Sequence, residues 1–399
     1  MRRLINQVRP YAWGSTTAIP RLLGREPDGT PQAELWLGAH PGAPSRLVTE
    51  DGEVPFCDVI AADPKDALGE RTVTRFGERL PFLLKVLAAE APLSLQVHPD
   101  AARARAGHAA EEAAGIAVDA PDRNYRDPHH KPELVLALEP FEALCGFRDP
   151  AEARADLEGF GCDLAEALRA DLAARDRRAA LRAAMTRLLT LSGRDRDALV
   201  ADLVAEFAAR LESGDPAGPH AATVVELAGR YPGDPGAAAA LLLNRITLRP
   251  GEALFLPAGN VHAYLRGTAV EIMAGSDNVL RAGLTAKHVD SAELLAVVDF
   301  AVLPIPYARP VAEDGRLDFR PGVADFALSV IGPGGAAAHL PGGAPTIVLA
   351  LEGSAVLRTD SGGELVLRRG ESAFVSAADG PVAVEGDAHL VAATTGGCW

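Results

Sequence analysis

The chain is poor in cysteine and in positive charge. Its 399 residues include four cysteines, Cys57, Cys145, Cys162 and Cys398. They are scattered and form no CxxC pair, which favours reduced thiols over a disulfide framework. Lys and Arg number 39 against 54 Asp and Glu, so the formal net charge is −15. An acidic protein of this kind is not expected to bind nucleic acid or an anionic membrane surface.

Long hydrophobic runs are also missing. No apolar run approaches the roughly 18 residues that a membrane span requires. The two arginines near the amino terminus are not followed by the apolar stretch of a secretory signal. We therefore expect a cytoplasmic protein. The 48% hydrophobic and 23% charged residues are those of an ordinary soluble globular chain, and the length allows two or three domains.

The most informative stretch is residues 92–100, which read PLSLQVHPD. In an extended strand Ser94, Gln96 and His98 share one face, and the intervening aliphatic residues share the other. Two possible metal ligands on one pleated face are typical of half a metal site. The alternative is a half-buried strand with a solvated polar face.

Two later strand-like segments repeat this spacing. In HHKPELVLAL, Lys131 and Glu133 lie two residues apart, and in FLPAGNVHAYL the same holds for His262 and Tyr264. The possible ligands are then Gln96, His98, Glu133 and His262. A mixed nitrogen and oxygen set suits zinc and leaves the metal a net charge of about +1 with which to act as a Lewis acid. Manganese, iron and cobalt are also compatible with it.

Several long motifs in one order resemble the class I mannose-6-phosphate isomerases, zinc enzymes of the cupin superfamily. The motifs are YAWGS at 11–15, AELWLGAHPGAPS at 33–45, residues 92–100, HKPELVLALEPFEALCGFR at 130–148 and residues 256–290. The resemblance implies one Zn²⁺ per chain, held by Gln96, His98, Glu133 and His262. One departure is His129, where the family often has Asn, and its imidazole could contact the metal ligands.

The resemblance and the sequence texture together predict a mainly β fold with an all-α insertion. We expect two cupin-like jelly-roll units, one catalytic and one degenerate. At Asp149 and Pro150 the pattern becomes helical, with an N-cap followed by proline at the first helical position. The predicted division is a catalytic domain over 1–149 and 246–300, a helical insertion over 150–245, and a non-catalytic β domain over 301–399.

An internal repeat supports the two-unit prediction. Residues 248–258 read LRPGEALFLPA and residues 367–377 read LRRGESAFVSA, so six of eleven positions match at an offset of 119. The same offset places His262 on Pro381, Tyr264 on Ala383 and Glu271 on Leu390. The second unit has therefore lost the polar residues and is expected to be non-catalytic.

The resemblance implies interconversion of D-mannose 6-phosphate and D-fructose 6-phosphate, through a cis-enediol(ate), in mannose metabolism or activated-mannose synthesis. Such a reaction needs a general base that moves a proton between C1 and C2, and Glu271 is the candidate. Lys131 is a candidate to relay protons or to bind a substrate hydroxyl, and Tyr264 to bind substrate. Asp277 is a candidate to assist ring opening.

An anionic substrate also needs local cations, because the net charge of the whole chain repels it. Arg281 matches the active-site arginine of the family and suits either a phosphate or a developing oxyanion. Lys287 and Ser94 are expected to complete a phosphate pocket. The expected partner is a small-molecule sugar phosphate, and the expected state is a monomer or a weak homo-oligomer.

Two other functions compete with this one. An iron-dependent cupin oxygenase more naturally uses two or three histidines and a carboxylate with open positions for oxygen. The basic segment 281–287 and the neutral Gln96 favour the isomerase. A sugar-binding or regulatory protein that keeps the metal without catalysis is the other alternative. Retention of the polar residues in the first unit alone weighs against it.

Overall fold

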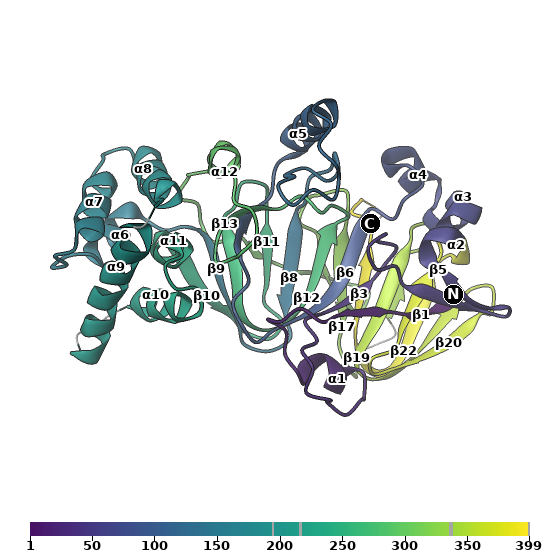
Figure 1. The fold of residues 1–399 in the computed structure, drawn as a ribbon. Helices are drawn as coiled ribbons and strands as arrows, with labels where there is room; N and C mark the ends of the chain where they lie inside the picture. The colour runs from purple at the N-terminus through teal and green to yellow at the C-terminus, as the bar shows by residue number, and fades with distance from the viewer. Residues whose placement is uncertain (194, 215–217, 335–337, 398–399) are drawn as a thin grey trace.

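The computed structural model describes residues 1–399 apart from 194, 215–217, 335–337 and 398–399. The helices between residues 150 and 239 gather at one end, a first β unit lies in the middle, and a second β unit occupies the other end (Figure 1). The predicted fold class is confirmed. Among the described helices, none combines the length and the apolar character that crossing a membrane demands.

The middle unit is built around one long strand, β12. Its main sheet has the order β2 (Gln7–Arg9), β3 (Glu34–Leu37), β6 (Phe82–Ala89), β12 (His262–Ala274), β8 (Glu133–Ala137), β11 (Ala253–Leu256) and β14 (Tyr307–Ala308). The first residues of β12 pair with β7 (Leu95–Val97) and β9 (Phe141–Phe147), which in turn pair with β13 (Leu280–Gly283) and β10 (Leu243–Leu248). The start of β12 is thus where the two parts of the sheet meet.

The predicted helical insertion lies between β9 and β10. It comprises α6 (Pro150–Ala155), α7 (Asp163–Leu172), α8 (Arg177–Thr190), α9 (Asp195–Glu212), α10 (Pro219–Arg230) and α11 (Pro235–Ala239). Asp149 caps α6 by accepting a hydrogen bond from the N–H of Ala151 at 2.9 Å, and Pro150 occupies the first turn. The apolar faces of these helices share one core with Leu95 and Val97 of β7. The insertion therefore packs against the back of the strand that carries Gln96.

The second unit forms the other large sheet. Its order is β15 (Val311–Glu313), β16 (Arg316–Phe319), β17 (Ala327–Ile331), β22 (Val382–Thr394), β19 (Thr346–Thr359), β21 (Ser372–Val375), β1 (Arg2–Ile5), β4 (Arg46–Thr49) and β5 (Gly52–Pro55). Two more strands are β18 (Ala338–Leu340) on β22 and β20 (Glu364–Arg368) on β19.

Sheet membership does not follow the predicted division of the chain. Strands β1, β4 and β5 come from the first 55 residues, yet they belong to the C-terminal sheet. The reason is that β21 would otherwise present an open edge, and β1 pairs with it in the register Arg3↔Ala373. Conversely, β14 lies within the predicted C-terminal domain, which begins at residue 301, yet it pairs with β11 in the middle sheet.

The remaining helices lie on the surface of the two units. They are α1 (Ala18–Leu22), α2 (Phe56–Ala62), α3 (Pro64–Leu68), α4 (Glu70–Phe76), α5 (Ala101–Ala113) and α12 (Ser291–Val297), with short 3₁₀ turns η1 (Ala240–Leu242) and η2 (Ala377–Asp379).

Candidate metal centre and substrate cleft

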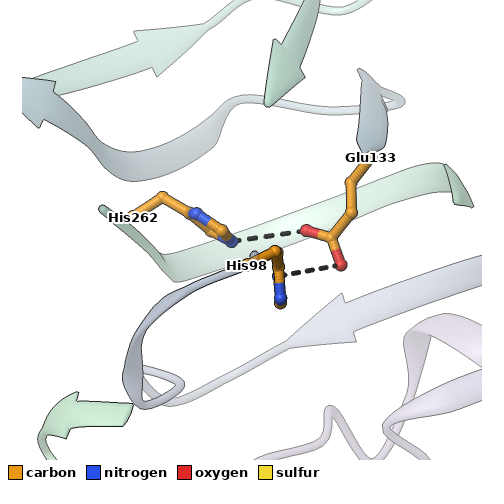
Figure 2. Close-up of side chains that lie close together, drawn as sticks. All are labelled: His98, Glu133 and His262. Carbon is orange, nitrogen blue, oxygen red and sulfur yellow. Dashed lines mark ion pairs between the residues drawn. The ribbon is translucent and has the colours of Figure 1, made fainter. Parts of the chain in front are cut away.

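Three predicted metal ligands come together where β7 ends and where β8 and β12 begin. His98, Glu133 and His262 are each only 1% exposed. One ligand atom from each lies within 4.8 Å of the others. The two carboxylate oxygens of Glu133 lie 3.3 Å from Nε2 of His98 and 3.3 Å from Nε2 of His262, as Figure 2 shows. One carboxylate thus faces two imidazoles at the meeting point of three strands.

Backbone carbonyls fix the tautomer of both imidazoles. Nδ1 of His98 lies 2.8 Å from the carbonyl oxygen of Asn278, and Nδ1 of His262 lies 3.0 Å from that of Asn260. Because a carbonyl only accepts, each Nδ1 carries the proton and donates it. The lone pair of each Nε2 then points at Glu133.

These inward-facing atoms have no hydrogen-bond partner in the part of the chain that the structure describes. They are Nε2 of His98, Nε2 of His262 and Oε2 of Glu133. Buried polar atoms without a partner are rare, and lone pairs that face one another repel. A divalent cation bound by all three would remove both problems. Such carboxylate and imidazole sets with carbonyl-bound Nδ1–H groups suit zinc.

Electrostatics keep the cluster in the state that binds a metal. Burial lowers the pKa of His98 to about 4, so its imidazole is neutral at pH 7. Burial alone would raise the pKa of Glu133. The ammonium of Lys131, with Nζ 2.7 Å from Oε1, overcomes it, and the Glu133 pKa lies well below its usual range. Metal ligands must be deprotonated, and His98 and Glu133 are.

Gln96 lies between this metal cluster and Arg281, the predicted active-site arginine. In β7 it pairs with His262 of β12 on one side and with Arg281 of β13 on the other. Its side chain is half-buried. This placement is compatible with the ligand role predicted for Gln96, which stays a prediction.

The predicted base lies in a buried chain of polar groups. Glu271 of β12 accepts a hydrogen bond from the hydroxyl of Tyr264 at 2.9 Å, and its other oxygen lies 3.1 Å from Nζ of Lys85. Glu34 lies on the far side of Lys85, at 3.6 Å. Burial raises the pKa of Glu271 although the Lys85 ammonium opposes this. Burial also raises the pKa of Tyr264 well above its usual value, so its hydroxyl remains a donor.

A cleft of about 860 Å³ opens beside these groups. Its lining includes Trp36, Lys85, Asp277, Arg281 and Lys287. Within the described residues neither Arg281 nor Lys287 forms an ion pair. Glu34, Asp119, Asp122 and Asp277 also line the cleft, but none of them pairs with these two cations. Both cations are therefore available to an anionic ligand.

Two other predicted residues are placed differently. Ser94 is half-buried beside Leu95, whose partner is Gly283, and it is absent from the described lining of the cleft. Asp277 does line the cleft, where its Oδ1 lies 3.3 Å from Nε2 of His40. Burial opposes ionisation of Asp277, but the hydrogen bond from His40 brings its pKa below the usual value.

The spare imidazole of His129 does not reach the metal cluster. Its Nδ1 lies 3.4 Å from the guanidinium of Arg79, in a neighbouring cavity of about 550 Å³. The backbone carbonyl of His129 instead accepts from the amide of Asn278 and from the hydroxyl of Ser276, in the segment whose Asn278 carbonyl holds His98.

Sequence reasoning missed Lys85, Glu34 and Asn278. Lys85 carries a readable signal, because it is the one charged residue of β6, whose eight residues are all buried. A buried lysine needs a carboxylate partner. Glu34 accepts a local hydrogen bond from Nε1–H of Trp36, but Lys85 comes from another strand. The partners of Asn278 are His98 and the loop at 126–129, far away in sequence.

Comparisons with known proteins agree with this geometry. Residues 1–150 match the family described as phosphomannose isomerase type I, catalytic domain, and residues 316–395 match the mannose-6-phosphate isomerase cupin domain. Mannose-6-phosphate isomerase of Salmonella typhimurium is 43% identical over 397 residues, which cover 98% of each chain. The Homo sapiens relative of the same name is 34% identical over 314 residues, covering 73% of this chain and 71% of the relative.

Solved structures are similar over the whole chain. A mutant phosphomannose isomerase from Salmonella typhimurium superposes with a TM-score of 0.91 at 40% identity, covering 99% of both chains. A zinc-bound mannose 6-phosphate isomerase superposes with a TM-score of 0.89, also at 40% identity and 99% coverage.

Proposed function

This chain belongs to the type I phosphomannose isomerase family, and on that premise we propose that it interconverts D-mannose 6-phosphate and D-fructose 6-phosphate. One observation carries the proposal most strongly. Three buried ligand atoms without partners converge beside a cleft whose cations Arg281 and Lys287 have no carboxylate partner in the described chain.

The metal centre of this proposal is one Zn²⁺ held by Nε2 of His98, Nε2 of His262, the carboxylate of Glu133 and the amide oxygen of Gln96. A zinc ion bound there supplies Lewis-acid stabilisation of negative charge on the substrate oxygens. The Nδ1–H bonds to Asn278 and Asn260 orient both imidazoles toward it.

Proton transfer falls to Glu271. Moving hydrogen between C1 and C2 requires a base that reaches both carbons on one face of an enediol(ate). The carboxylate of Glu271 accepts the proton from one carbon and returns it to the other. Tyr264 and Lys85 fix its position through their contacts with its two oxygens. Its raised pKa makes it a stronger base than an exposed glutamate.

The remaining residues bind and prepare the sugar. Lys131, beside Glu133, relays a proton or binds a substrate hydroxyl, and Tyr264 contributes to substrate binding. Lys287 binds the phosphate together with Arg281, which also suits a developing oxyanion. Ser94 stays a candidate for the phosphate, although it is outside the described lining of the cleft. Asp277 is ionised and lines the cleft, so it can accept the ring hydroxyl proton when the sugar opens.

The cellular setting is part of the proposal. We infer that the chain works in the cytoplasm as a monomer or a weak homo-oligomer, in mannose catabolism or in the supply of activated mannose. Reduced thiols support the compartment, because Cys57, Cys145 and Cys162 are all free.

Proton NMR of the purified protein with fructose 6-phosphate in D₂O tests the activity. We expect mannose 6-phosphate to appear, to stop appearing on chelation, and to return when zinc is added. Deuterium at C2 of the product would further identify exchange through an enediol. A metal-loaded protein that produces no mannose 6-phosphate would contradict the proposal and favour a sugar-binding protein.

A further inference from the structure

Arg126 is a cation of the cleft that the chemistry above does not use. It lies in the loop between α5 and β8 and lines the cleft together with Arg281 and Lys287. Its side chain is exposed, and the described residues give its guanidinium no ion pair. It also lines the neighbouring cavity, so it stands at the junction of the two.

The three cations repel one another. Burial lowers the pKa of Arg281, and the charge of Arg126 lowers it further. Burial also lowers the pKa of Lys287, and both arginines add to the effect, with Glu34 as the opposing charge. A protein with 54 acidic and 39 basic residues has many carboxylates that could neutralise such a cluster. The cleft itself is lined by Glu34, Asp119, Asp122 and Asp277, and Arg126 helps to lower the pKa of Asp277. None of these carboxylates forms an ion pair with the three cations among the described residues, so the repulsion within the cluster remains and a bound dianion would relieve it.

The backbone of Arg126 is held in place from the metal side of the cleft. Its N–H donates to Oδ1 of Asn278 at 2.8 Å. The amide of Asn278 donates to the carbonyls of Asp127 at 2.7 Å and His129 at 2.9 Å, and the carbonyl of Asn278 accepts from His98. One fully buried asparagine thus fixes both a metal-centre imidazole and the loop of Arg126. Such shared support is typical of preorganised binding groups.

We propose that Arg126 is a third cationic contact to the substrate phosphate, beside Arg281 and Lys287, and that it favours phosphorylated over unphosphorylated sugars. This inference rests on the proposed function. A guanidinium presents a planar fork to two oxygens of a dianion, which the ammonium of Lys287 does not. At the exposed mouth of the cleft it also attracts the dianion against the net charge of the chain.

Substrate discrimination tests the inference. In Arg126→Ala we expect kcat/KM for mannose 6-phosphate to fall by roughly 10-fold to 100-fold, the range for hydrogen bonds to charged groups. The kcat/KM for unphosphorylated mannose should change little. Arg126→Lys should recover part of the kcat/KM that Arg126→Ala loses for mannose 6-phosphate. Zinc content should match that of the wild type. Arg105→Ala removes an exposed arginine of α5 outside the cleft, and it should leave kcat/KM unchanged for both substrates.

Binding of inorganic phosphate gives a readout without turnover. Calorimetry on the zinc-loaded protein should show a Kd for phosphate that is roughly 10-fold higher in Arg126→Ala. An unchanged Kd, or equal losses for both sugars, would overturn the role of Arg126. A wild type that binds phosphate but does not isomerise the sugar phosphate would instead overturn the proposed function.

Discussion

The two β units are built on one frame, and the one His, Glu and His group that could hold a metal among the described residues lies in the first. In each, a strand, a turn glycine and a second strand follow one another, as β10 and β11 in the first and β20 and β21 in the second. Gly251 and Gly370 occupy equivalent turns with φ of 85° and 80°, where a side chain would be strained. Each unit then has a 13-residue strand, β12 or β22.

The difference lies in the residues that the frame presents. Strand β12 begins with His262, and Leu256 of β11 pairs with Glu133. Strand β22 begins with Val382, and Val375, the repeat counterpart of Leu256, pairs with Thr346. Backbone pairing and apolar burial are therefore sufficient for the frame, and the metal centre is a separable addition to it.

The units also differ at one connection. Strands β9 and β10 pair with each other, as do β19 and β20. A tight turn joins the second pair, with the N–H of Gly362 bound to the carbonyl of Thr359. The first pair carries the helical insertion, whose core includes Leu95 and Val97. The first unit thus has a helical core packed behind β7.

The largest effect is expected from making the first unit resemble the second. His262→Ala removes one of the three ligand atoms that converge on the proposed zinc. We expect zinc to be lost, and kcat/KM to fall by roughly 10³-fold or more, because a Lewis acid contributes several kcal/mol. Elemental analysis and the isomerase assay measure both. His389→Ala, in the second unit, is the control and should retain zinc and rate.

The variant Arg281→Ala removes a cation from the cleft and leaves the proposed metal ligands in place. Its guanidinium lies in the cleft without a described ion pair, so its loss should lower turnover by roughly 10²-fold to 10³-fold, as for other groups that stabilise developing charge. Zinc content should not change. Loss of zinc, or a near-normal rate, would show that the residue supports the structure rather than the reaction.

A matched pair of core variants sharpens the comparison. Leu248 and Leu367 are repeat counterparts, and both are fully buried. Replacing either by Ala should reduce the free energy of unfolding by about 2–5 kcal/mol, measured by urea denaturation. Leu248 shares a core with Tyr264, whereas Leu367 lies in the core of the second unit. Only Leu248→Ala should therefore also lower kcat of the folded enzyme, and a lower kcat in Leu367→Ala would mean that the second unit acts on the site.

Tyr264→Phe should give the smallest effect, a change in pH dependence. The Tyr264 hydroxyl donates to Glu271 and stabilises its ionised form, so removing it raises a pKa that burial has already raised. The ionised base is lost as pH falls through this pKa. The acidic limb of the pH profile of kcat should therefore move to higher pH by about one unit. A limb that stays in place would argue against Glu271 as the base.

Local sequence patterns predicted the parts of the site that lie on strand faces. Alternation along residues 92–100 placed His98 and Gln96 on one face, and the same spacing identified Glu133 and His262. The change of pattern at Asp149 and Pro150 predicted the helical insertion. These features are local, because period-two alternation and helix capping are properties of neighbouring residues.

Features that depend on distant pairing were not predictable in this way. Strand β1 pairs with β21 across more than 360 residues, and nothing in its own sequence states that partner. Lys85 stands out in a buried strand, but Glu34 and Glu271 come from two other strands. Arg126 resembles an ordinary surface arginine until the fold places it beside Arg281.

The most direct test of the account is a titration of chelator-stripped protein with zinc, followed by metal binding and isomerase rate together. We predict that the rate rises from near zero in proportion to bound zinc and saturates at one zinc per chain, the single site of the first unit. Activity in the stripped protein, or saturation at two zinc ions per chain, would contradict the claim that only the first unit carries the chemistry.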